Sequence, residues 1–203
     1  MKKICRFLVE NNSDECVLEF LRKSGFFEKY KVIRCDPVTS SHERRDREIL
    51  RALLSKNMDE KTRIKTLKDV FLHLDGVKKL VITDPYIFKK GRNVNVIDVF
   101  GKLIDGIKTN LEEVKFLCPD DAKKDDEVFD GVKDILNKNK IKMTVEKCDE
   151  FHDRFWVGID NRKGVVLGTS LNGIGKKIAL VDILKKSDVD AIIDELKIAG
   201  LVA

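Results

Sequence analysis

The sequence predicts an α/β protein whose sheet is mixed but mostly parallel, with helices on both faces and an N-terminal α/β extension. From residue 79 onward, short apolar runs alternate with stretches that carry apolar residues at helical spacing. Such alternation of strands and helices is typical of a parallel sheet covered by helices. Further apolar runs over 155–181 are separated by turns too short for crossover connections, so the last strands should pair antiparallel.

Residues 1–76 are expected to form the extension, and they suggest no role of their own. Gly25 fits the end of a first helix. Apolar residues at helical spacing, among them Leu53 and Leu67, predict a long helical region with a break near Asn57. The expected elements are a strand over 4–9, a helix over 13–22, a strand over 30–35 and a helical region over 39–74 that is split at 57–59.

Residues 77–203 are expected to form the main domain. Its strands are short runs rich in Val, Ile and Leu, and its helices carry one apolar stripe each. The expected elements are strands over 79–83, 114–117, 141–145, 155–159, 164–167 and 178–181, and helices over 94–107, 126–136 and 188–198.

Composition sets wide bounds on function. The 203 residues are 42% hydrophobic, which is enough to bury a core. The 40 basic and 35 acidic residues give a net charge of +5, which permits an anionic partner without requiring one. The five cysteines form no C-x-x-C pair and only three histidines occur, so we expect neither a metal site nor a disulfide scaffold, and no cofactor.

The first residues do not resemble a targeting segment. The apolar run over 4–9 is interrupted by Arg6 and ends at Glu10, which is too short for a signal peptide. No stretch approaches the roughly 18 apolar residues of a membrane span. The expectation is therefore a soluble, cytoplasmic protein.

The first candidate for chemistry is the turn Asp84-Pro85-Tyr86, which follows a predicted strand. Ligand sites of open α/β sheets lie at the carboxyl ends of the strands, so Asp84 and Tyr86 are candidate ligand contacts. The same residues also suit an ordinary turn, because Pro fixes φ and Asp accepts hydrogen bonds from nearby amides.

The second candidate is His152-Asp153-Arg154, at the start of a predicted strand. Residues i and i+2 of a strand face the same side, so His152 and Arg154 can converge on one anion. The imidazole could act as a nucleophile or general acid at phosphorus, and the guanidinium could hold phosphate oxygens bidentately. The alternative is an exposed histidine beside an arginine that forms a salt bridge.

The third candidate is the loop over 168–177, which is rich in glycine and hydroxyl groups and ends in two lysines. Glycines allow the backbone to approach a ligand closely, and Thr169, Ser170 and Asn172 can donate hydrogen bonds. The loop is not a Walker A motif, because Ile174 occupies the lysine position after Gly173 and a strand, not a helix, is expected to follow.

Together these segments resemble the phospholipase D superfamily, whose signature is H-x-K-x4-D followed by G-S-x-x-N. His152 matches the nucleophilic histidine, Arg154 falls on the lysine position, and Asp160 comes one residue after the aspartate position. The histidine–aspartate–arginine run is similar to a variant found in the C-terminal domain of MIT-domain proteins, a phosphoinositide-binding module without hydrolysis, and in prokaryotic phospholipase D-like proteins. The resemblance covers about residues 78–203 and implies a phospholipase D-like fold.

The resemblance implies a phosphodiesterase, most readily one that acts on nucleic acid without a metal. One motif copy per chain implies a homodimer in which one His152 attacks phosphorus and the other protonates the leaving group. The alternative is a non-catalytic module that recognises phosphate on nucleic acid or, less favoured, on an acidic lipid surface, because arginine replaces lysine and Asp160 is displaced. A third possibility is a relic fold whose N-terminal helices recruit a partner. The implied catalytic residues are His152, Arg154 and Asp160, and the implied binding residues are Asp84, Tyr86, Asp153, Thr169, Ser170, Asn172, Lys176 and Lys177.

Overall fold

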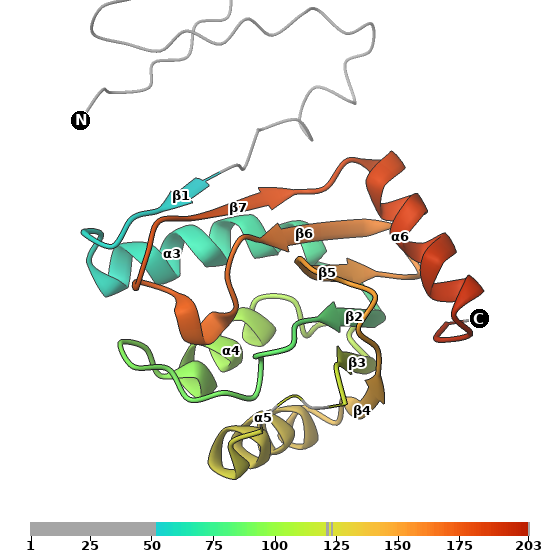
Figure 1. Ribbon diagram of the computed structural model, residues 1–203, viewed down its shortest axis with the longest axis horizontal. Coiled ribbons are helices and arrows are strands. Elements are labelled where there is room, and N and C mark those ends of the chain that lie inside the picture. The colour runs from blue at the N-terminus through green and yellow to red at the C-terminus, as the bar shows by residue number, and fades with distance from the viewer. Residues whose placement is uncertain (1–51, 121, 123, 203) are drawn as a thin grey trace, which may run out of the picture. The chain divides into compact units, whose positions relative to one another are not determined.

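The computed structural model describes residues 52–120, 122 and 124–202, and these form one mixed α/β unit (Figure 1). The strands expected over 4–9 and 30–35 and the helix expected over 13–22 lie outside the described residues. So does the first part of the helical region expected over 39–74.

A seven-stranded sheet in the order β1-β7-β6-β5-β2-β3-β4 forms the centre of this unit. The pairs β2–β3 and β3–β4 are parallel, and the other four pairs are antiparallel. The expected mixed sheet is confirmed, but parallel pairs are not in the majority, because the last strands pair antiparallel at the centre of the sheet. The strands are β1 (Ala52–Leu54), β2 (Lys79–Thr83), β3 (Glu113–Cys118), β4 (Lys142–Lys147), β5 (Arg154–Gly158), β6 (Lys163–Leu167) and β7 (Ala179–Ile183).

Helices cover both faces of the sheet, as expected. Side chains of α3, α4 and α5 pack with Ile82 and Phe116 on one face, whereas α6 packs against Val81 and Leu117 on the other. Successive strand residues point to opposite faces, which explains why neighbouring apolar residues serve different layers. The helices are α3 (Glu60–Phe71), α4 (Val96–Asp105), α5 (Asp126–Lys138) and α6 (Lys186–Ile198), with short 3₁₀ turns η1 (Leu72–Leu74) and η2 (Leu171–Gly173).

Local signals fix where two of these helices begin. The Asp59 side chain accepts a hydrogen bond from Thr62 N at 2.9 Å at the start of α3. The Asn95 side chain accepts one from Asp98 N at 3.1 Å at the start of α4. Each cap satisfies a backbone donor that has no partner inside the helix.

Trp156 on β5 is the centre of the larger core. Its ring is fully buried and lies 4.8 Å from the Phe71 ring and 6.0 Å from the Phe100 ring, measured between centroids. Phe71 ends α3 and Phe100 lies in α4, so two helices converge on this one strand. Burial of such large side chains is a main source of the stability of the domain.

Residues 52–74 belong to the same core, although the sequence placed them in a separate extension. β1 pairs with β7, and Leu54, Leu67 and Phe71 are buried in the cluster that contains Trp156. The boundary expected at residues 76 and 77 therefore falls inside one packed unit. Residues 52–54 were also expected to be helical, but pairing with β7 makes them a strand despite the helix preference of Ala and Leu.

Candidate functional site

The strand register brings the three candidate segments to one edge of the sheet. Thr83, the last residue of β2, pairs with Phe155 near the start of β5. Arg154 pairs with Leu167, the last residue of β6. The segments that follow β2, precede β5 and follow β6 therefore meet at the carboxyl edge of the parallel strands, where ligand sites of α/β sheets form.

Thr83 fixes the start of β5 against the end of β2. Its buried hydroxyl donates to Asp153 O at 3.0 Å and accepts from Phe155 N at 3.0 Å. One hydroxyl thus holds the backbone on both sides of Arg154. These hydrogen bonds fix the position of the Arg154 backbone at the edge of the sheet.

Asp84 is a buried acid at this edge, with an exposed fraction of 1%. Its Oδ1 accepts a hydrogen bond from Tyr86 N at 2.9 Å, which closes the turn expected from the sequence. Burial raises the pKa of Asp84 from 3.8 to about 6, although the Tyr86 amide, the Ser170 hydroxyl and the Arg154 charge all act to lower it.

Replacing Asp84 by Asn is expected to stabilise the protein at neutral pH. The folded protein holds the Asp84 proton more tightly than the unfolded chain, so the wild-type free energy of unfolding should fall between about pH 4 and about pH 6. The free energy of unfolding of the variant should exceed that of the wild type by up to about 3 kcal/mol at pH 7 and by little at pH 4. Urea unfolding at both pH values measures this, and an equal effect at the two would contradict the assignment.

One hydrogen-bond donor beside Asp84 lacks an acceptor. Arg154 Nε is buried and has no hydrogen-bond partner within the described ranges, whereas the buried Ser170 hydroxyl has the Asp84 carboxyl as its neighbour. The Ser170 hydroxyl lies near enough to Asp84 to affect its pKa. Among the described residues, the other end of the guanidinium donates only to His152 O, at 3.5 Å, which is at the limit for such a bond. Buried donors normally find acceptors, so this cluster can accommodate an acceptor such as a phosphoryl oxygen.

Tyr86 lies beside these donors with its ring partly exposed, at 41%. The Lys89 ammonium is 4.5 Å from the ring centroid, and the Arg154 guanidinium carbon is 5.9 Å from it. Both distances suit cation–π contact. The sequence reasoning singled out Tyr86 but missed Lys89, although a lysine three residues after the turn was a usable signal.

His152 and Asp153 lie at the same edge but point into solvent. The His152 side chain is 97% exposed, and its Nδ1 is 3.4 Å from Asp153 Oδ1. A general base or nucleophile usually needs a group that orients it, and this long, exposed contact is a weak one. The histidine therefore lies outside the buried cluster of Asp84, Arg154 and Ser170.

Asp160 lies at the opposite edge of the sheet. Its carboxylate accepts hydrogen bonds from Lys78 N at 3.0 Å and Lys79 N at 3.0 Å, so it holds the start of β2. The five residues of β5, each about 3.3 Å long, separate it from His152. The position implied by the motif thus does not bring Asp160 to the histidine, because an extended strand carries it away.

The candidate residues of the loop after β6 differ in their exposure and contacts. The Thr169 hydroxyl is turned toward Gly173 and so fills its own loop, and Asn172 is half-buried. Lys176 and Lys177 follow Gly175, which has φ of +80°, and both side chains are exposed at the same edge. They provide positive charge near the site without touching its centre.

Arg63 is a buried arginine that the sequence did not single out. It lies in α3 with its guanidinium against Gly175, where any side chain on the glycine would collide with it. It donates to Met58 O. Nothing in the spacing of α3 distinguishes it from the exposed cations of the same helix, Lys61, Lys65 and Lys68.

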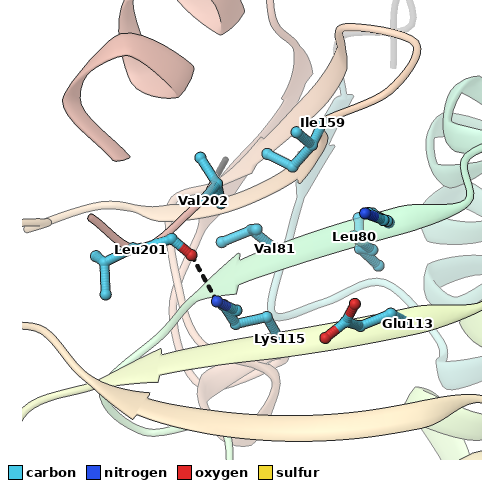
Figure 2. A pocket seen from close by; sticks show the side chains of 8 residues that line it. Leu80, Val81, Glu113, Lys115, Ile159, Leu201 and Val202 are labelled. Carbon is cyan, nitrogen blue, oxygen red and sulfur yellow. Dashed lines mark hydrogen bonds between the residues drawn. The ribbon is translucent and has the colours of Figure 1, made fainter. Parts of the chain in front are cut away.

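Two pockets flank the sheet. One, of about 140 Å³, lies at the edge where β2 and β3 begin and is closed by the C-terminal residues Leu201 and Val202 (Figure 2). Its Lys115 is already engaged, by Leu201 O at 2.5 Å and Glu146 at 2.7 Å. The other, of about 450 Å³, is formed mainly by the loop over 90–95 and the first residues of α4, at the carboxyl edge.

The described ranges hold neither a cluster of metal-binding side chains nor a helix that could span a membrane. Those residues contain no group of three or more His, Cys, Asp or Glu side chains that could hold a metal ion. None of their helices has both the length and the apolar character needed to cross a membrane.

Comparison with known proteins identifies the family. Residues 53–177 match the family described as "Phospholipase D-like domain at C-terminus of MIT". This match covers more than half of the chain, begins within β1 and includes α3 as well as the three candidate segments. The chain belongs to this family of phospholipase D-like domains, as its motifs suggested.

The likeness to solved structures is weak. The archaeal chromatin protein TrmBL2, described as showing a novel mode of DNA binding, is 13% identical with a TM-score of 0.40, over 93% of this chain and 60% of that one. A polyphosphate kinase from Porphyromonas gingivalis is 9% identical with a TM-score of 0.41, over 85% and 30%. The chain thus spans less than two thirds of either protein, and neither likeness carries an argument about function. No curated protein matches the chain.

Proposed function

We propose that this domain is a phosphate-recognition module that binds a phosphate-bearing ligand, with nucleic acid favoured, at the carboxyl edge of its sheet. The observation that carries the proposal is the buried Arg154 Nε donor, which lacks an acceptor in the described part of the chain and has the Ser170 hydroxyl and the Tyr86 ring nearby. A phosphoryl group offers several strong acceptors and a negative charge, and arginine binds such groups bidentately.

The surroundings of Arg154 support an extended anionic ligand. Lys89 and Arg154 both contact the Tyr86 ring, and Lys176 and Lys177 are exposed at the same edge. Cations that follow a backbone of phosphates, with an aromatic ring among them, are typical of nucleic-acid binding without strict sequence preference. A lipid head group has the same phosphate chemistry and is the alternative source of the ligand.

Hydrolysis is a second candidate, favoured by one observation. His152 lies at the edge that holds Arg154 and Ser170 and is almost wholly exposed, so a second copy of the chain could approach it. Two His152 side chains across a homodimer could then act as nucleophile and acid without a metal. The exposed imidazole and the distant Asp160 favour binding over turnover.

Replacing His152 by Ala is expected to leave ligand affinity within about twofold, because the exposed imidazole supplies no buried donor. Fluorescence anisotropy with a labelled single-stranded oligonucleotide measures the affinity, which should fall as salt rises. The same samples, incubated with EDTA, should show no cleavage. Cleavage that disappears in His152→Ala would establish the hydrolase instead.

Vesicles test the alternative ligand in the same way. Binding to phosphoinositide vesicles but not to oligonucleotides would assign the module to lipid head groups. Neutral vesicles provide the control for nonspecific adsorption. Binding to neither probe at low salt would contradict the proposed function.

A further inference from the structure

Thr83 pairs with Phe155 across β2 and β5, and the buried Asp84 directly follows Thr83 while Arg154 directly precedes Phe155. The register therefore places Asp84 beside the arginine that the proposed function puts at the centre of the site. We propose that Asp84 sets the anion affinity of Arg154, so that an anion bound to the guanidinium is accompanied by a proton bound to the carboxyl. This inference rests on the proposed function and adds a regulatory property to the same site.

Hydrogen bonds and burial hold the Asp84 carboxyl inside the protein. Its carboxyl accepts from Tyr86 N at 2.9 Å, and its carbonyl oxygen accepts from Cys118 Sγ at 3.4 Å and Ile87 N at 3.4 Å. With only 1% of the residue exposed, the carboxyl cannot turn out to water. Its charge must therefore be balanced by neighbours or removed by a proton.

Arg154 is the charged neighbour that stabilises the carboxylate. Its positive charge lowers the pKa of Asp84, against the larger effect of burial, and the pKa settles at about 6. An anion on the guanidinium would offset that positive charge and add a negative one. The ionised form of Asp84 then loses its support, and the carboxyl takes up a proton at a higher pH than before.

The other groups around Asp84 do not carry charge near neutral pH. Ser170 and the Tyr86 amide contribute hydrogen bonds. The Cys118 thiol, on β3, stays neutral, because burial and the Asp84 charge raise its pKa to about 11. The Lys124 charge lowers the pKa of Cys118 but is not among the groups that shift the pKa of Asp84. Arg154 is thus the partner through which Asp84 can respond to a ligand.

The test measures anion affinity against pH with sulfate, which keeps its charge across the range. Histidines as a class change charge between about pH 5 and pH 8, so the background carries His152→Asn. Affinity of this background for sulfate, measured by calorimetry, should rise about tenfold from about pH 8 to about pH 5, which corresponds to a one-unit rise of the Asp84 pKa on binding.

Replacing Asp84 by Asn in that background should give tighter binding at the upper end of the range and remove most of the slope. Asp134→Asn, an exposed aspartate on α5, is the matched control and should keep the slope. If the slope persists in Asp84→Asn, or if sulfate binds to the parent protein without pH dependence, the inference is wrong while the proposed function stands. No sulfate binding at any pH by any of these proteins would overturn both.

A second measurement needs no variant at Asp84. The carboxyl carbon signal of Asp84 in nuclear magnetic resonance reports its protonation directly. Its titration midpoint should move to higher pH when sulfate is saturating. An unchanged midpoint under saturating sulfate would overturn the inference even if Asp84→Asn failed to fold.

Discussion

Replacing Arg154 by Gln is expected to lower the affinity for a single-stranded oligonucleotide by about 10- to 100-fold. The guanidinium supplies the buried Nε donor, which lacks an acceptor among the described residues, and it lies beside Tyr86. Hydrogen bonds that involve a charged group contribute about 1.5–3 kcal/mol each, which corresponds to this loss. Fluorescence anisotropy at low salt measures the change.

Arg162 provides a matched control for that substitution. It lies at the opposite edge of the sheet, after β5, and pairs with Asp190 at 2.6 Å. Arg162→Gln removes the same charge and should change affinity by about twofold or less, since only long-range charge is lost. Arg154→Lys should fall between wild type and Arg154→Gln, because a lysine keeps the charge but not the planar donors. Equal losses in Arg154→Gln and Arg162→Gln would point to general charge attraction and against a site at Arg154.

Replacing Leu67 by Ala is expected to lower the free energy of unfolding by about 3 kcal/mol. Leu67 in α3 is fully buried in the cluster that contains Trp156, and truncation of a buried leucine leaves a cavity that the core fills only in part. Because α3 packs in the same core as β2 and β5, unfolding should remain one cooperative transition. Urea denaturation followed by fluorescence of Trp156 measures both properties.

Lys65 is the control in the same helix. Its side chain is exposed, so Lys65→Ala should change stability by about 0.5 kcal/mol or less. A Leu67→Ala protein as stable as Lys65→Ala would show that α3 is not part of the core. It would also restore the domain boundary that the sequence suggested at residues 76 and 77.

The sequence predicted much of the fold because most elements carry their own signal. β2 was expected over 79–83 and lies at those residues, and α5 was expected over 126–136 and extends to Lys138. Apolar runs and helical stripes are local patterns, and the core uses them directly. β1 carries no such signal: Ala52–Leu54 favours a helix by composition, and only pairing with β7 makes it a strand. The order of the strands, which sets the ratio of parallel to antiparallel pairs, is likewise a long-range property.

The site was predictable to the extent that it depends on strand ends. Asp84, Arg154 and Ser170 each follow or begin a strand, and the register brings them together. Asp160 was implied by motif spacing alone, and that spacing does not show that β5 carries it to the opposite edge. The role of Thr83 depends on contacts with the start of β5, a segment far away in the sequence, and has no clear sequence pattern, whereas Lys89 contacts Tyr86 three residues before it and could have been found.

The most direct test of the central claim is a nuclear magnetic resonance titration that follows the Nε–H signal of Arg154 as a 5′-phosphorylated oligonucleotide is added. A phosphate bound at this edge gives the buried Nε donor an acceptor, so its proton should shift strongly downfield and exchange more slowly with water. We expect the Arg154 Nε–H and Ser170 amide signals to shift together, and to shift at lower oligonucleotide concentration than amide signals at the opposite edge near Lys79. Saturation of binding with the Arg154 Nε–H unchanged would contradict the central claim.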